Sequence, residues 1–155
     1  METQIGITKK ESTDSVKILT EVLCNEMVLM IKTRNFHWNV KGNSFMELHK
    51  VTDAQYDELN EIVDAIAERI SKLGGRAIGS MKEFISGASL KESTNAKDQD
   101  KMLEILLSDN NDMCTMIRKH IEKLSETKDF VTTDFLTGVL EKHENFAWVL
   151  RSYLS

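Results

Sequence analysis

The feature that most constrains this chain is the absence of proline from all 155 residues, together with only seven glycines. Strand-rich folds need frequent turns, and turns are built largely from glycine and proline. The composition therefore argues against a β-sandwich or a barrel and favours a few long helices. A chain of this length usually forms one domain and can bury a core without disulfides or a structural metal.

Four long stretches carry apolar residues at every third or fourth position, which is the period of one helix face. Residues 1–13 are polar and lack this pattern, so we expect a flexible tail there. Residues 14–155 then form a single bundle domain. Thr13 or Asp14 is expected to cap the first helix, and Gly42 to end it.

The second helix is predicted to begin with a capping box formed by Ser44 and Glu47 and to end at Gly74–Gly75. The other expected helices span about residues 98–126, Thr132 to the end, and a short turn at 81–85. Four long helices indicate an all-α four-helix bundle. The short helix lies in the long connection between the second and third, which favours a crossover over up-and-down wiring.

The charge and the cysteines exclude several classes of protein. Twenty basic and 25 acidic residues give a net charge of −5, which excludes a strongly basic nucleic-acid-binding module. Cys24 and Cys114 lie ninety residues apart, so we expect two reduced, buried thiols rather than a disulfide framework. No apolar run suits a secretory signal or a membrane span. Together these features predict a cytoplasmic protein.

One group of residues on the second helix has the chemistry of a metal site. His49 and Asp53 are four positions apart, as are Asp64 and Glu68. A rotation of about 100° per residue places all four within one quadrant of the helix. The two pairs are nevertheless ~16 Å apart along the axis, whereas metal–ligand bonds measure about 2.0–2.6 Å. One subunit therefore cannot bring both pairs to one metal.

A second copy of this helix could bring the pairs together if the two helices ran antiparallel across a two-fold axis. His49 and Asp53 of one chain would then face Asp64 and Glu68 of the other, and the symmetry would form the site twice. His37, near the end of the first helix, could add a second imidazole. This donor set suits iron, with zinc or manganese as alternatives. Acidic helix faces are usually only solvated, so a metal-free bundle stays open at this point.

The same residues resemble the Dps family, the miniferritins named as DNA-binding proteins from starved cells. The resemblance covers about residues 14–154 and rests on these segments: Asn35–Gly42, Leu48–His49, Asp53, Asp64–Arg69 and Leu73–Gly75. It implies a ferritin-like bundle assembled as a hollow dodecamer. It also implies a ferroxidase site between two-fold-related subunits, with five metal ligands: His37, His49, Asp53, Asp64 and Glu68.

Members of the Dps family oxidise Fe(II), usually with hydrogen peroxide in preference to oxygen, and store the Fe(III) mineral inside the shell. The resemblance places Trp38 near the site, where it would take up oxidising equivalents, although helix packing explains this tryptophan equally well. It also matches Asp134, and less closely Asp129, to the region that lines the three-fold pores for iron. The ordinary explanation for both acids is a favourable interaction with a helix N-terminus.

The remaining histidines and tryptophan have no assigned role in the site. None of the four histidines follows a glutamate by three residues, which excludes the intra-bundle di-iron pattern of ordinary ferritins. His120 and His143 have no carboxylate at a matching spacing within their helices, so we expect both at the surface. We expect Trp148 in the core.

DNA binding in this family often depends on a basic terminal tail. In residues 1–14, Lys9 and Lys10 are outweighed by three acidic residues, and twelve copies of a chain with a net charge of −5 carry −60. That field repels phosphate. We therefore expect iron oxidation and storage as the function, protecting against oxidative damage, with DNA binding weak or absent at neutral pH. The alternative is a protein whose main role is DNA compaction.

Overall fold

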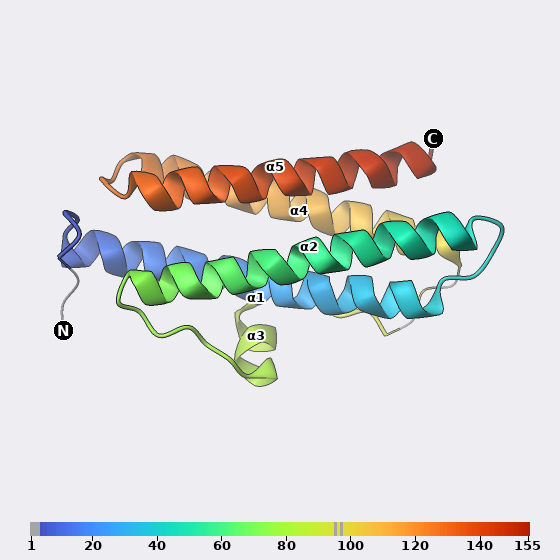
Figure 1. Ribbon diagram of the computed structural model, residues 1–155, viewed down its shortest axis with the longest axis horizontal. Helices are drawn as coiled ribbons and strands as arrows, with labels where there is room; N and C mark the ends of the chain where they lie inside the picture. Colours follow the sequence, from blue (N-terminus) through green and yellow to red (C-terminus); the bar gives the residue numbers. More distant parts are fainter. Residues whose placement is uncertain (1–3, 95, 97) are drawn as a thin grey trace.

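Five helices make up the fold in the computed structural model, which describes residues 4–94, 96 and 98–155 (Figure 1). They are α1 (Lys9–Asn39), α2 (Phe45–Lys72), α3 (Met81–Gly87), α4 (Gln99–Ser125) and α5 (Phe130–Tyr153). No strand occurs among the described residues. The predicted all-α four-helix bundle with a short extra helix is confirmed.

The four long helices pack as two antiparallel pairs, α1 with α2 and α4 with α5 (Figure 1). The connection from α2 to α4 runs back along the bundle, so these two helices point the same way, as a crossover requires. The short helix α3 lies in this connection and packs against the outside of α1. Within the described part of the chain, no helix is both long enough and apolar enough to cross a membrane.

Apolar side chains from all four long helices form one continuous core. Completely buried members from the four helices include Leu29, Ile66, Ile117 and Leu136. Burying a side chain of this size contributes about 1.5–3 kcal/mol relative to leaving it exposed. The packing of α1 against α2 fixes the C-terminal end of α1 relative to the N-terminal end of α2.

The first helix begins at Lys9, so the prediction of a flexible tail through residue 13 is wrong for residues 9–13. Thr8 is the N-cap: its hydroxyl accepts from the Glu11 amide, and the Glu11 carboxylate accepts from the Thr8 amide at 2.8 Å. The carboxylate of Glu11 also accepts from the Lys128 amide at 3.0 Å. These contacts hold the first turn without an apolar stripe, which is why periodicity did not reveal it. The helix ends at Asn39, before Gly42.

The two ends of α2 differ in how well the sequence predicted them. Ser44 is the N-cap residue, but its side chain makes no capping hydrogen bond, so the predicted capping box is wrong. At the other end, Gly74 has a φ of +81° and its amide donates to Ser71, while the Gly75 amide donates to Ile70. These two bonds form a Schellman motif, as the glycine pair predicted.

The predicted surface positions of His120 and His143 are wrong, because both side chains are buried. His143 lies between helices, with Nε2 2.7 Å from Oε1 of Glu26 and Nδ1 2.8 Å from Oδ1 of Asn110. Spacing within one helix cannot reveal partners that other helices supply. Trp148 was expected in the core, but it is 59% exposed.

Candidate metal centre

His37 at the end of α1 and His49 at the start of α2 lie face to face, with ring centroids 3.9 Å apart and 16° between the planes. Nδ1 of His37 is 2.9 Å from the carbonyl oxygen of His49, and Nδ1 of His49 is 3.0 Å from that of His37. A carbonyl only accepts, so each Nδ1 carries a proton and donates it. With the Nδ1 proton held in this way, the neutral form of each ring has its lone pair on Nε2, as a metal ligand requires.

Asp53 lies one helical turn after His49 and belongs to the same cluster as the two imidazoles. Its Oδ1 is 3.5 Å from Nε2 of His37 and 3.2 Å from Nη1 of Arg34. The guanidinium of Arg34 lies 4.0 Å over the ring of Tyr56 and 5.6 Å over that of Trp38. Three of the five residues predicted as ligands, His37, His49 and Asp53, thus lie together where α1 and α2 meet, and we call this cluster the half-site.

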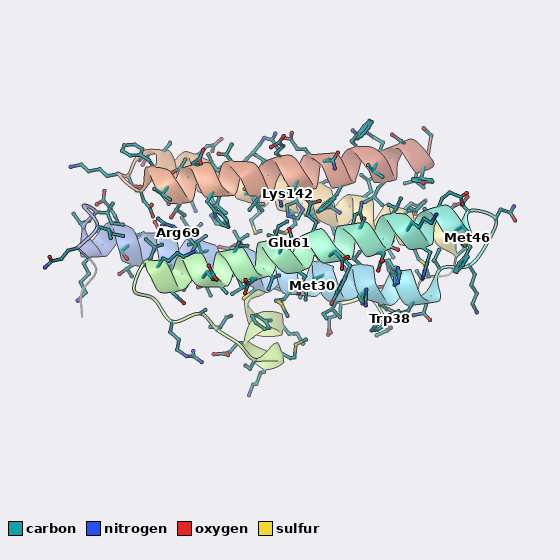
Figure 2. The ribbon with its side chains drawn as sticks, viewed as in Figure 1. Met30, Trp38, Met46, Glu61, Arg69 and Lys142 are labelled. Carbon is teal, nitrogen blue, oxygen red and sulfur yellow. The ribbon has the colours of Figure 1, made fainter. Side chains whose placement is uncertain are left out.

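Asp64 and Glu68 are both exposed and lie further along α2. The ammonium group of Lys72 lies 2.7 Å from the Glu68 carboxylate, and this hydrogen bond lowers the pKa of Glu68 below its ordinary value. Figure 2 shows how far the two pairs are separated: Trp38, next to His37, and Arg69, next to Glu68, lie in opposite halves of the bundle. Among the described residues, no three histidine, cysteine or acidic side chains of one chain could together hold a metal.

Arg34 and Tyr56 are site residues that the sequence reasoning missed. Arg34 precedes His37 by three positions, and Tyr56 follows Asp53 by three. Residues three apart lie on the same helix face, so this spacing was the available signal. This spacing identifies such neighbours only after the ligands themselves have been assigned.

The two aspartates matched to an iron pore have different surroundings. Asp129 is buried as the N-cap of α5, and its carboxylate accepts from the Thr132 hydroxyl at 2.7 Å and from Arg69 at 2.9 Å. Burial opposes its ionisation, but these donors together hold the pKa of Asp129 below its ordinary value. Its carboxylate is thus engaged in capping and in the ion pair. Asp134 is exposed in the next turn.

Comparisons with known proteins agree with this fold. Residues 16–155 match the ferritin-like domain family. The chain is 33% identical to DNA protection during starvation protein 2 of Bacillus anthracis, over 90% of this chain and 96% of the relative. The chain belongs to the Dps branch of the ferritin-like family. An uncharacterized low temperature-induced protein of Nostoc sp. is 38% identical over 97% of this Dps chain and 85% of its own length.

A solved Dps structure gives the same result at the level of the fold. The Dps protein of Vibrio cholerae, described as a member of a broad superfamily of ferritin-like diiron-carboxylate proteins, matches with a TM-score of 0.94. It is 28% identical and covers 99% of this chain and 97% of its own. The resemblance to the Dps family that we inferred from the sequence is therefore confirmed.

Proposed function

We propose that this protein oxidises Fe(II) at sites shared between two subunits and stores the Fe(III) product as mineral inside a hollow shell of twelve copies. The reciprocal hydrogen bonds of His37 and His49 carry the proposal, because they leave both Nε2 atoms as electron-pair donors beside Asp53. Iron is the favoured metal because the Vibrio cholerae Dps is described as a diiron-carboxylate protein. Zinc and manganese are the alternatives for this donor set.

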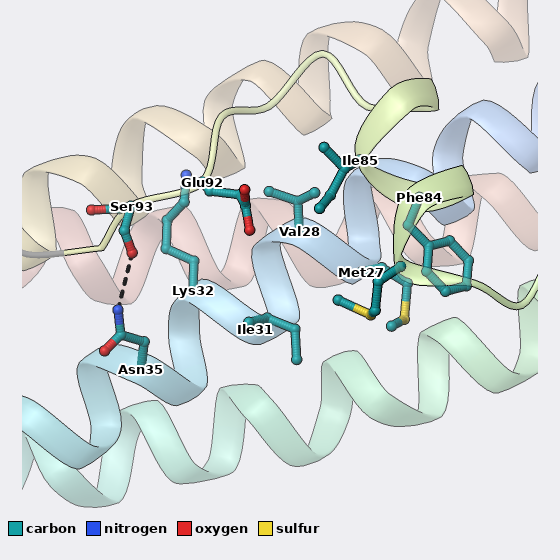
Figure 3. A pocket seen from close by; sticks show the side chains of 10 residues that line it. Met27, Val28, Ile31, Lys32, Asn35, Phe84, Ile85, Glu92 and Ser93 are labelled. Atoms are coloured by element: carbon teal, nitrogen blue, oxygen red, sulfur yellow. Dashed lines mark hydrogen bonds between the residues drawn. The ribbon is translucent and has the colours of Figure 1, made fainter.

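A second copy of the chain would complete the site with its own Asp64 and Glu68. Apolar surface near the half-site supports such an interface: Ile31, Trp38, Met81 and Ile85 are 45–68% exposed. Figure 3 shows a pocket between α1 and α3, lined in part by Ile31 and Ile85. Clustered exposed apolar side chains are typical of protein–protein contacts.

Each residue has a proposed part in the oxidation. Two Fe(II) ions would give up one electron each, and hydrogen peroxide would accept both electrons and two protons to leave as two waters. The two imidazoles and three carboxylates would bind the iron as substrate. Nη1 of Arg34 lies 3.2 Å from Oδ1 of Asp53, and a carboxylate that binds a metal can keep such a hydrogen bond, so the guanidinium would orient Asp53 toward the iron.

Trp38 and Asp134 have supporting roles in the proposal. Packing within one chain does not explain Trp38, because its side chain is 68% exposed. Its position beside the half-site supports a role in taking up residual oxidising equivalents. The exposed Asp134 is proposed to line the pore through which iron enters, whereas Asp129 acts as a helix cap. The cytoplasmic setting stays a prediction.

DNA protection is the second candidate function, because the Bacillus anthracis relative carries that name. The charge of this chain disfavours it as the main role. Lys10, one of the two lysines near the N-terminus, is paired with Asp14 at 2.6 Å. This ion pair reduces the positive charge that the region could offer to phosphate.

A matched pair of variants tests the proposed ferroxidase site. Asp53→Asn removes a ligand charge with little change in shape, so Fe(II) oxidation by peroxide should slow roughly tenfold or more. Glu122→Gln removes the same charge from an exposed position on α4, away from the ligand-bearing face of α2, and should leave the rate unchanged. The measurement is the initial rise in Fe(III) absorbance. Wild-type oxidation by Asp53→Asn would refute the assignment.

A further inference from the structure

A third histidine–carboxylate pair bridges α1 and α4, away from the proposed ferroxidase site. Nε2 of His120 lies 3.4 Å from Oε2 of Glu21. Glu21 precedes His37 by sixteen residues on α1, which is about 24 Å along the helix. The His120 ring is only 6% exposed, and neither of its nitrogens has a hydrogen-bond partner. A buried polar side chain without a partner destabilises the fold unless something else satisfies it.

The spacing of this pair suits a shared metal better than a direct hydrogen bond. Charge-assisted N–H···O bonds measure about 2.7–2.9 Å. Two ligands bound at about 2.1 Å to one tetrahedral metal lie about 3.4 Å from each other. His143 and Glu26 show the spacing of a direct contact in this protein, at 2.7 Å.

The protonation state of His120 also suits a metal ligand. Burial lowers the pKa of His120 below its ordinary value; Glu21 opposes this shift and Lys123 supports it. A lowered pKa favours the neutral imidazole, which retains a lone pair for a metal. The Glu21 carboxylate is 48% exposed, so an ion can approach it from solvent.

The pair lies at a surface pocket formed by α1, α4 and the crossover connection. Its lining residues are Glu21, Ser89, Leu90, Asp112, Thr115, Met116, Lys119, His120 and Lys123. The two lysines and the two acidic residues cancel in formal charge, so the pocket has no net positive charge to repel a cation. The thioether of Met116 accepts from Nδ2 of Asn25 at 3.6 Å and is therefore already engaged.

We propose that His120 and Glu21 bind one divalent transition-metal ion of the zinc type at this pocket, independently of the proposed ferroxidase site. An imidazole with a carboxylate suits Zn²⁺, whereas Mg²⁺ and Ca²⁺ prefer oxygen ligands alone. Two protein ligands leave the remaining positions to water. The site is therefore open to exchange with solvent rather than a closed structural site.

Zinc content of the assembled full-length protein tests this proposal. Glu21→Gln removes the carboxylate from an exposed position. Asp112→Asn is the control, because it removes a charge from the same pocket and leaves His120 and Glu21 unchanged. After incubation with Zn²⁺ and gel filtration, Glu21→Gln should contain one zinc fewer per chain than wild type and than Asp112→Asn. Zinc at the proposed ferroxidase site contributes equally to all three proteins.

Anomalous scattering from zinc-soaked crystals locates the ion directly. We expect a peak between Nε2 of His120 and the Glu21 carboxylate. In a separate assay, Glu21→Gln should oxidise Fe(II) at the wild-type rate. A wild-type zinc count in Glu21→Gln, or no peak at this pair, would overturn the proposal. The Asp53→Asn test of iron oxidation is separate, so either proposal can fail without the other.

Discussion

At the scale of single residues, Glu26 and His143 form a fully buried pair inside the bundle. The Asn110 amide donates to the Leu106 carbonyl at 2.8 Å, so its oxygen faces His143 and accepts from Nδ1. Nε2 of His143 is then hydrogen-bonded to Oε1 of Glu26 at 2.7 Å. Both groups depend on this bond, because neither has access to water.

We predict that Glu26→Leu lowers the free energy of unfolding by about 3–5 kcal/mol, because it leaves His143 buried with an unpaired nitrogen. Glu26→Gln should cost less, since its amide can still hydrogen-bond to the ring. Denaturation in urea measures both. A surface control is Glu144→Gln, which loses an exposed ion pair with Arg118 and should change stability by less than about 1 kcal/mol. Wild-type stability of Glu26→Leu would contradict this account.

Sequence spacing found the residues of the candidate site better than it found their partners. His37, His49 and Asp53 come together as predicted because they lie near the ends of two helices joined by a short loop. The partner of His143 is 117 residues away in the chain, on α1. No periodicity within α5 contains that information, which is why His143 was placed at the surface.

At the scale of helices, periodicity located every long helix, whereas the ends depended on local chemistry. The glycine pair predicted the end of α2 correctly because a positive φ strongly favours glycine. The start of α1 was missed because Thr8 and Glu11 hold it without apolar residues. Ser44 matched the capping pattern, yet its φ of −100° and ψ of 25° are not those of a typical capping residue.

Two glycine variants are predicted to change stability in opposite directions. Gly74→Ala places a side chain at a φ of +81° and should destabilise the protein by about 1–2 kcal/mol. Gly138→Ala lies within α5, where an added Cβ meets nothing within 4 Å, and should stabilise it by about 0.5–1 kcal/mol. Parallel urea titrations measure both. Equal shifts in one direction would show that backbone conformation does not decide these positions.

At the scale of the whole molecule, charge governs what the proposed shell of twelve copies can bind. A chain with a net charge of −5 repeated twelve times gives −60, and a Debye length of about 8 Å at physiological salt screens this field only partly near the surface. Avidity from twelve N-terminal segments acts in the opposite direction.

We predict little or no retardation of duplex DNA in a gel-shift titration at neutral pH and physiological salt, with chelator present. Lower pH or Mg²⁺ should increase binding, because each neutralises acidic groups. The control is deletion of residues 1–13, which removes Lys9 and Lys10 together with the first turn of α1. Tight, salt-sensitive retardation that this deletion abolishes would make DNA binding part of the primary function.

Recovery of Fe(II) oxidation in mixed particles tests the shared site most directly. One variant lacks His49 and Asp53, and the other lacks Asp64 and Glu68; each alone should oxidise Fe(II) slowly. After dissociation and joint reassembly, a mixed two-fold pair regains one intact site, so activity should return. No recovery, with mixed particles confirmed by native mass, would contradict a site built from two chains.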